Sequence, residues 1–177
     1  MADLAGDTED RRVVFVQDFQ VAERPYEEVV AWIGQDARRL FQRALEDARV
    51  EGERLRGRVC PANWPAVLAK TVELRCEPLR IRGDLALVAF SWRASGAPSL
   101  FPELDADLEI APFGTWQTRL TLLGRYQPPG GALGWHLDQL VLRRLAESTL
   151  RAFLRSLCAA VEEAVPNTER SRKQSLS

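Results

Sequence analysis

The fold of this chain is decided by residues 131–165, GALGWHLDQLVLRRLAESTLRAFLRSLCAAVEEAV, which follow the helix-breaking run PPG at 128–130. Apolar side chains recur here at steps of three and four residues, which places them on one broad face of a helix. Charged residues such as Arg144, Arg151 and Arg155 fall on the opposite face. At about 1.5 Å per residue, this helix reaches on the order of 50 Å and exceeds the length of a strand of ~10 residues. The pattern therefore predicts one helix that crosses a whole sheet.

Most of the chain before this helix is predicted to form antiparallel strands. Alternation of apolar and polar residues, with β-branched and aromatic side chains, indicates strands at 13–21, 67–77, 85–93, 104–110 and 115–126. Turn residues at 83–84 and 112–114 predict two hairpins. Between the first two strands we expect two helices, at 26–33 and 35–53, with Gly34 as the break.

The hairpin at 104–126 has the clearest division between a buried and an exposed face. Leu104, Ala106, Leu108 and Ile110 are predicted to face inward, together with Trp116, Thr118, Leu120 and Leu122 on the returning strand. Asp105, Asp107 and Glu109 then face outward, opposite Arg119 and Arg125. Cross-strand pairs between these charges contribute up to about 1 kcal/mol each, so we expect an exposed lattice of ion pairs.

The composition indicates a single globular domain. Of the 177 residues, 46% are hydrophobic and 28% charged, which is too apolar for a disordered chain. We expect one domain at 13–165 between flexible polar tails at 1–12 and 166–177. The 24 basic and 25 acidic side chains nearly cancel, which argues against a nucleic-acid partner.

The sequence contains no pattern typical of a membrane or secreted protein. The first 12 residues are polar and acidic, unlike a signal peptide, and no run approaches the ~18 apolar residues that a transmembrane helix needs. We therefore expect a cytoplasmic protein without an integral membrane segment. Cys60, Cys76 and Cys158 are too widely spaced for a disulfide framework or a Cys-x-x-Cys site.

Neither a metal nor a cofactor is expected. The carboxylates of Asp105, Asp107 and Glu109 alternate along one strand, which gives a solvated stripe rather than a coordinating loop. The glycines at 130, 131 and 134 precede a helix but belong to no nucleotide-binding fingerprint.

The order of elements resembles a known superfamily. A strand, two helices, several antiparallel strands and one long C-terminal helix occur together with a diffuse residue pattern: Leu100-Phe101-Pro102, Leu108 to Pro112, Gly124, Tyr126, Pro128-Pro129 and Leu133-Gly134. Over 13–165 the chain resembles the START/Bet v 1-like superfamily, also called SRPBCC or polyketide cyclase/lipid-transport proteins. The resemblance implies an α+β helix-grip fold, in which a curved antiparallel sheet wraps around the C-terminal helix. It also implies a hydrophobic ligand or lipid between them and, in a minority of members, catalysis of ring closure or dehydration.

A pocket between the sheet and the last helix has a predicted lining. The candidate ligand-binding residues are Phe15, Phe19, Val72, Leu74, Leu108, Ile110, Trp116, Leu120, Leu145, Thr149 and Phe153. Such pockets are mostly apolar, with a few placed polar groups, although the same residues can also pack as a solid core. The candidate catalytic residues are His136, which is the only histidine, and the hydroxyls of Thr118 and Thr149. No serine or cysteine is placed beside His136 by a motif, and Asp138, two residues further along the predicted helix, does not share its face.

Three functions remain open from the sequence. The first is the binding or transport of a hydrophobic small molecule or lipid by a monomer or dimer. The second is a cyclase/aromatase or dehydratase-like enzyme that uses the same pocket. The third is a structural or oligomerising module, which a solid core and an exposed apolar patch would favour.

Overall fold

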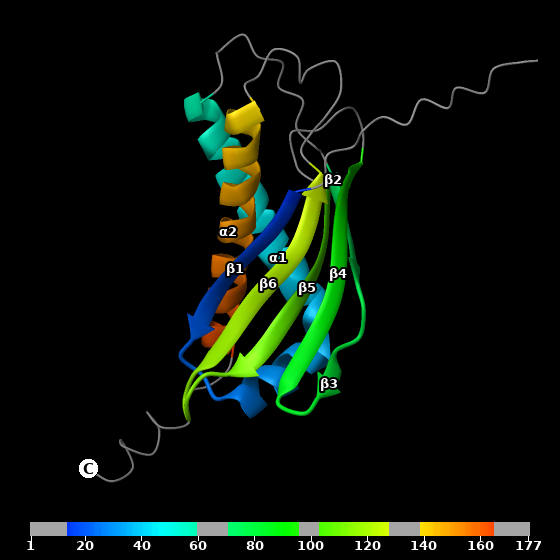
Figure 1. Cartoon of the computed structure of the whole chain (residues 1–177), viewed down its shortest axis with the longest axis vertical. Coiled ribbons are helices and arrows are strands. Elements are labelled where there is room, and N and C mark those ends of the chain that lie inside the picture. The colour runs from blue at the N-terminus through cyan, green and yellow to red at the C-terminus, as the bar shows by residue number, and fades with distance from the viewer. Residues whose placement is uncertain (1–13, 60–70, 96–102, 128–138, 165–177) are drawn as a thin grey trace, which may run out of the picture.

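The computed structural model describes residues 14–59, 71–95, 103–127 and 139–164, which form one antiparallel sheet and two long helices (Figure 1). In chain order the elements are β1 (Val14–Ala22), α1 (Tyr26–Val59), β2 (Thr71–Cys76), β3 (Arg80–Arg82), β4 (Leu85–Ser95), β5 (Glu103–Pro112), β6 (Thr118–Gln127) and α2 (Gln139–Ala164). The strand order is β1-β6-β5-β4-β2, and the short β3 pairs with β4.

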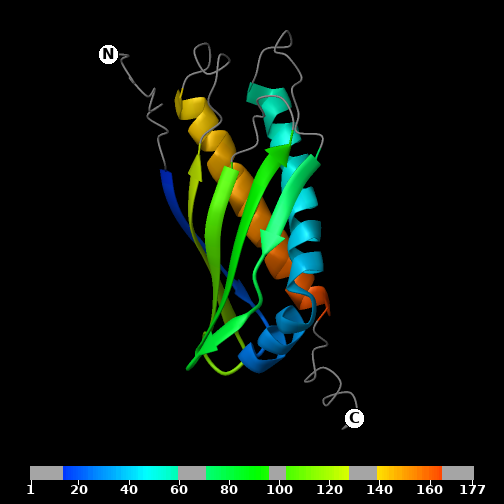
Figure 2. The same ribbon diagram turned by 90° about the vertical axis from the view of Figure 1, so that its right-hand side faces the viewer.

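Both helices cover the same face of the sheet, side by side and antiparallel (Figures 1 and 2). We call this covered face the inner face and the opposite one the outer face. The upper end of the sheet is the end at which β1 and β5 begin and β4 and β6 end (Figure 1). The predicted α+β helix-grip fold is confirmed. From the sequence we expected α2 alone to pack on the inner face, whereas both α1 and α2 do so.

The core lies between the sheet and the two helices. Along β5, Leu104, Leu108 and Ile110 are buried, as the alternation predicts, and Phe41 and Phe153 reach the sheet from α1 and α2. The inner face of β4, which the pattern left unassigned, is the one that carries Phe90 and Trp92.

The predicted break between two helices lies at Asp36, not at Gly34. The helix runs from Tyr26 to Val59 with a kink at Asp36, whose φ and ψ are −153° and 53°. The Asp36 Oδ1 accepts a hydrogen bond from the backbone N–H of Arg39 at 3.2 Å, as the N-cap residue of a helix does. The kink therefore occurs where an aspartate can start the second helical segment.

The prediction that Phe15 and Phe19 face the helix is wrong. Antiparallel partners point to the same face, so Asp18 and Gln20, opposite the buried Leu122 and Leu120, face inward. Asp18 forms an ion pair with Arg151 of α2, with 3.5 Å between Oδ2 and Nε. Phe15 and Phe19 consequently lie on the outer face, 83% and 58% exposed.

The inward prediction for Trp116 is also wrong. Strand β6 begins at Thr118, and Trp116 belongs to the preceding hairpin turn, where it is 54% exposed. That turn is closed by a hydrogen bond of 2.9 Å from the N–H of Phe113 to the carbonyl of Gln117, and Gly114 has a φ of 79° that favours glycine. Side chains alternate between the two faces only within a strand, so the alternation does not predict the direction of Trp116 in the turn.

A polar cluster ties the end of α2 to the end of β1. The N–H of Glu23 donates to Oε1 of Glu162 at 2.8 Å, and the guanidinium of Arg24 donates to the backbone carbonyl of Glu162. The Thr118 hydroxyl donates to the carbonyl of Arg24 at 2.7 Å. Because the last carbonyls of a helix lack partners within the helix, the Arg24 cation both satisfies one and complements the helix dipole.

We expect Arg24→Ala to destabilise the protein by about 1–2 kcal/mol, since it removes a charge-assisted hydrogen bond from the end of α2. Urea denaturation measures the loss, and hydrogen exchange should report faster opening at the end of α2. The control is Arg39→Ala, a substitution of an exposed arginine of α1 outside this cluster, which should change stability by less than about 0.5 kcal/mol. Equal effects of the two substitutions would show that the cluster does not stabilise the helix end.

No helix in the described ranges is long and apolar enough to cross a membrane. The predicted tails at 1–12 and 166–177 lie outside the described residues. The cytoplasmic location stays a prediction.

Candidate functional site

The predicted ligand-binding residues separate into two groups. Leu108, Ile110, Leu120, Phe153 and Thr149 are buried on the inner side, and Leu74 is half-buried there. Phe15, Phe19 and Trp116 lie elsewhere, as described above. His136 and the side chains of Val72 and Leu145 lie outside the described part of the chain. A role for the inner group in binding a ligand stays a prediction.

The two threonine candidates have different surroundings. Thr118 is completely buried, and its hydroxyl donates a hydrogen bond to the Arg24 carbonyl. This bond gives the Thr118 side chain a structural role. Thr149 is buried on α2, one turn before Phe153, whose ring contacts Trp92 of the sheet. Catalytic roles for both threonines remain predictions.

Four aromatic rings fill the middle of the space between the sheet and the helices. Phe153 of α2 lies 4.9 Å from Trp92 and 5.5 Å from Phe90, measured between ring centroids. Phe41 of α1 lies 4.9 Å from Phe90 and 5.9 Å from Phe153 in edge-on contacts, the geometry that aromatic quadrupoles favour. At the level of Phe153, side chains therefore occupy the space that the sequence analysis assigned to a pocket.

One row of inner-face residues lies nearer the upper end of the sheet. The register joins five residues from one edge of the sheet to the other: Leu74, Trp92, Leu104, Tyr126 and Val14. We call this set the upper row. The three central members are buried, whereas Leu74 and Val14, at the two edges, are only half-buried. The upper row is thus an apolar wall that is incompletely covered at its edges.

The inner side offers little acid–base chemistry in the part of the chain that the structure describes. The buried hydroxyl groups there are those of Thr118, Thr149 and Tyr126, while Thr121, which is also buried, lies opposite Phe19 on the outer face. Burial, assisted by the charges of Glu162 and Glu23, raises the pKa of the Cys158 thiol to about 11. The thiol is protonated at neutral pH and is therefore a poor nucleophile.

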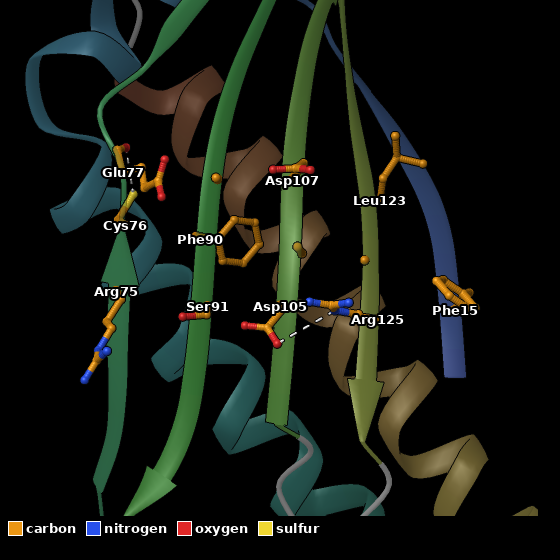
Figure 3. Close-up of a pocket in the computed structure, with 13 residues that line it drawn as sticks. Phe15, Arg75, Cys76, Glu77, Phe90, Ser91, Asp105, Asp107, Leu123 and Arg125 are labelled. Carbon is orange, nitrogen blue, oxygen red and sulfur yellow. Dashed lines mark hydrogen bonds and ion pairs between the residues drawn. The ribbon is translucent and has the colours of Figure 1, made fainter. Parts of the chain in front are cut away.

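A groove of about 660 Å³ lies on the outer face of the sheet (Figure 3). Its lining comes from five strands and comprises Phe15, Arg75, Cys76, Glu77, Ala89, Phe90, Ser91, Asp105, Ala106, Asp107, Leu123, Gly124 and Arg125. Alternation along β5 and β6 identifies the outward carboxylates and Arg125, but a groove requires small side chains such as Ala89 and Ser91 on the neighbouring strand. The sequence alone does not show that Ala89 and Ser91 lie beside Asp107 and Asp105, because this depends on the register between β4 and β5.

The expected lattice of ion pairs on this face is largely absent from the described residues. Arg125 and Asp105 are opposite each other, with 4.0 Å between Nε and Oδ2. Asp107 faces Leu123 and Glu109 faces Thr121, so neither has an arginine opposite it. No group of three or more His, Cys, Asp or Glu side chains in the described ranges is placed to hold a metal ion.

The sequence matches no family model and no curated protein. Solved structures of similar fold include the Zhui aromatase/cyclase from Streptomyces sp. R1128, at 12% identity and a TM-score of 0.41, over 88% of this chain and 98% of that one. Norcoclaurine synthase from Thalictrum flavum has 8% identity and a TM-score of 0.39 over 88% and 90% of the two chains. A human StarD lipid transfer and protein localization domain has 14% identity and a TM-score of 0.39 over 81% and 76%.

These proteins are START/Bet v 1-like, the superfamily that the sequence resembles. At such low identity, the likeness concerns only the arrangement of helices and strands. The ligand and the activity of the present chain therefore have to be argued from its own residues.

Proposed function

We propose that this protein binds a hydrophobic small molecule or lipid between the sheet and α2, at the upper row. The site extends from the ring cluster of Phe41, Phe90, Trp92 and Phe153 toward the upper end of the sheet. Its walls are apolar side chains from the inner face, which match the chemistry of such a ligand.

The observation that carries this proposal is the incomplete cover of the upper row. An apolar side chain gains about 25 cal/mol for each Å² of surface removed from water. Leu74 and Val14 retain part of that surface in water, while the residues between them are buried. An apolar ligand in contact with these edges would therefore gain free energy without displacing the ring cluster.

Binding is favoured over catalysis because none of the acidic or basic residues in the described ranges is fully buried. The inward-facing Asp18 is half-buried and is paired with Arg151 of α2. Ring closure or dehydration needs at least one group that moves a proton in the transition state. The buried hydroxyl groups of Thr118, Thr149 and Tyr126 are weak acids and bases, and that of Thr118 already donates a hydrogen bond to the Arg24 carbonyl.

Titration with 1-anilinonaphthalene-8-sulfonate, followed by competition with palmitate, tests the proposal. We expect saturable binding of the dye and its displacement by the fatty acid. Leu74→Gln should weaken dye binding about tenfold, because an unsatisfied amide at an apolar contact costs about 1–2 kcal/mol. Glu73→Gln, on the outer face of the same strand, is the matched control and should leave the affinity unchanged.

Two results would contradict the proposal. One is the absence of saturable dye binding by the folded wild-type protein. The other is loss of binding in Phe15→Gln but not in Leu74→Gln, since Phe15 is exposed on the outer face.

A further inference from the structure

The outer groove is built on one straight row of side chains that crosses the sheet. The register places Arg75 beside Ser91, Ser91 beside Asp105, Asp105 beside Arg125, and Arg125 beside Phe15. These residues belong to β2, β4, β5, β6 and β1 in turn. Neighbouring strands lie ~4.8 Å apart, so the row is ~19 Å long from Arg75 to Phe15. Figure 3 shows its side chains spread over the outer face.

The two ends of the row differ in chemistry. Arg75, on β2, forms no ion pair or hydrogen bond with another described residue, so its charge is available to a partner. Phe15, on β1, presents an aromatic ring that is 83% exposed, next to the half-buried Leu123 of β6. The row thus begins with a cation and ends with an apolar platform.

The middle of the groove carries unpaired negative charge. Asp107, one step from the row on β5, has Ala89 and Leu123 on either side and no ion-pair or hydrogen-bond partner within the described ranges. Among the described residues, its neighbour Asp105 has only the distant contact with Arg125, with 4.0 Å between Nε and Oδ2. A basic group placed over β5 would therefore meet two carboxylates.

Glu77 does not cancel the charge of Arg75, because it is paired with Arg80. Along the groove, the available features are therefore a cation at Arg75, an anionic group formed by Asp105 and Asp107 together, and an aromatic surface at Phe15. Each lies two strands from the next, which corresponds to ~10 Å.

We propose that the outer groove docks a peptide segment of a partner protein in the polyproline II conformation. The segment carries an acidic residue, a basic residue three positions later and an aromatic residue three positions after that. A chain in the polyproline II conformation rises ~3.1 Å per residue and completes a turn every three residues. Side chains three positions apart therefore lie on the same side of it, ~9 Å from one another, which is close to the ~10 Å between successive features of the groove. The acidic side chain meets Arg75, the basic one meets Asp107 and Asp105, and the ring packs on Phe15. The small side chains of Ala89 and Ser91 leave room for the backbone between the first two contacts.

Charge complementarity excludes three simpler occupants. A nucleic acid or an anionic membrane would meet Asp105 and Asp107 in the middle of the groove and be repelled. A wholly basic segment would be repelled by Arg75. The alternation of charge along the groove thus selects a segment of mixed sign.

The test uses two synthetic peptides with blocked termini, Glu-Ala-Ser-Lys-Ala-Ser-Phe and its charge-exchanged counterpart Lys-Ala-Ser-Glu-Ala-Ser-Phe. The wild-type protein should bind the first peptide at least about fivefold more tightly in a fluorescence anisotropy titration, since each exposed ion pair is worth up to about 1 kcal/mol. Arg75→Glu combined with Asp107→Lys should reverse that preference. The double variant should retain the wild-type unfolding midpoint, because both side chains are exposed.

The matched control exchanges the same charges outside the groove, in Arg82→Glu combined with Asp84→Lys. This control should keep the wild-type preference. Phe15→Ser should weaken both peptides to a similar degree without changing which is preferred. Equal affinity of the two peptides for the wild-type protein, no binding of either, or an equal response of the control variant would overturn the proposal.

Discussion

Phe153→Ala should destabilise the protein by about 3–5 kcal/mol, the largest effect that we expect from a single substitution. Phe153 is completely buried on α2 and contacts Phe41, Phe90 and Trp92. Its removal takes away the ring that joins both helices to the sheet and leaves a cavity that the remaining rings cannot fill without leaving their rotamers. Urea denaturation, followed by circular dichroism, measures the loss.

Arg155→Ala is the matched control for this substitution, because Arg155 lies two residues further along α2 on its exposed side. We expect a change of less than about 0.5 kcal/mol there. A loss at Phe153 below about 1.5 kcal/mol, which is closer to an Ile→Val change than to loss of a buried ring, would mean that the ring cluster does not join the helices to the sheet.

Gly124→Ala should destabilise the protein by about 2 kcal/mol, because it overpacks a contact between β5 and β6. A Cβ atom at Gly124 would lie 2.7 Å from the Cβ of Ala106 and 3.0 Å from the carbonyl oxygen of Asp105. Both neighbours are fixed to the backbone, so the two strands would have to move apart. The shift in the urea midpoint at unchanged slope measures the effect.

A double-mutant cycle separates this contact from the intrinsic cost of a strand substitution. Ala106→Gly alone removes a methyl group and should itself destabilise the sheet, but it also removes the nearest obstacle to a Cβ at Gly124. The double variant should therefore be more stable than the sum of the two single effects predicts, by about 1 kcal/mol or more. Strict additivity would show that the approach of Ala106 is not what makes glycine necessary.

The sequence predicts the parts of this fold in which one strand face is clearly apolar and the other clearly polar. Leu104 to Ile110 alternates without exception, and the structure buries the predicted side chains of β5. The long apolar face at the end of the chain likewise predicts α2. Turn residues such as Gly83, whose φ is 59°, locate the hairpin between β3 and β4.

Strand β1 shows why alternation alone does not decide a face. Val14 and Val16 are apolar on one side, and Phe15 and Phe19 are apolar on the other, so hydrophobicity favours neither side. The choice is made by pairing with β6, which turns Asp18 toward Arg151 on α2. Neither interaction can be identified before the partner strand and helix are known.

The outer groove and the ring cluster depend on contacts that are distant in the sequence. Phe41 reaches Phe153 because α1 continues past Asp36 and lies beside α2, an arrangement that helical periodicity does not specify. The groove depends on Ala89 and Ser91 lying beside the β5 carboxylates. Local patterns identify these residues as outward-facing but do not bring them together.

The most direct test of ligand binding at the upper row is a methyl NMR titration with palmitate. We predict that the methyl signals of Val14, Leu74 and Leu104 shift and saturate together, while that of Leu123, which lines the outer groove, stays unchanged. Shifts confined to Leu123, or no saturable shift at any of these methyl groups, would contradict binding between the sheet and α2.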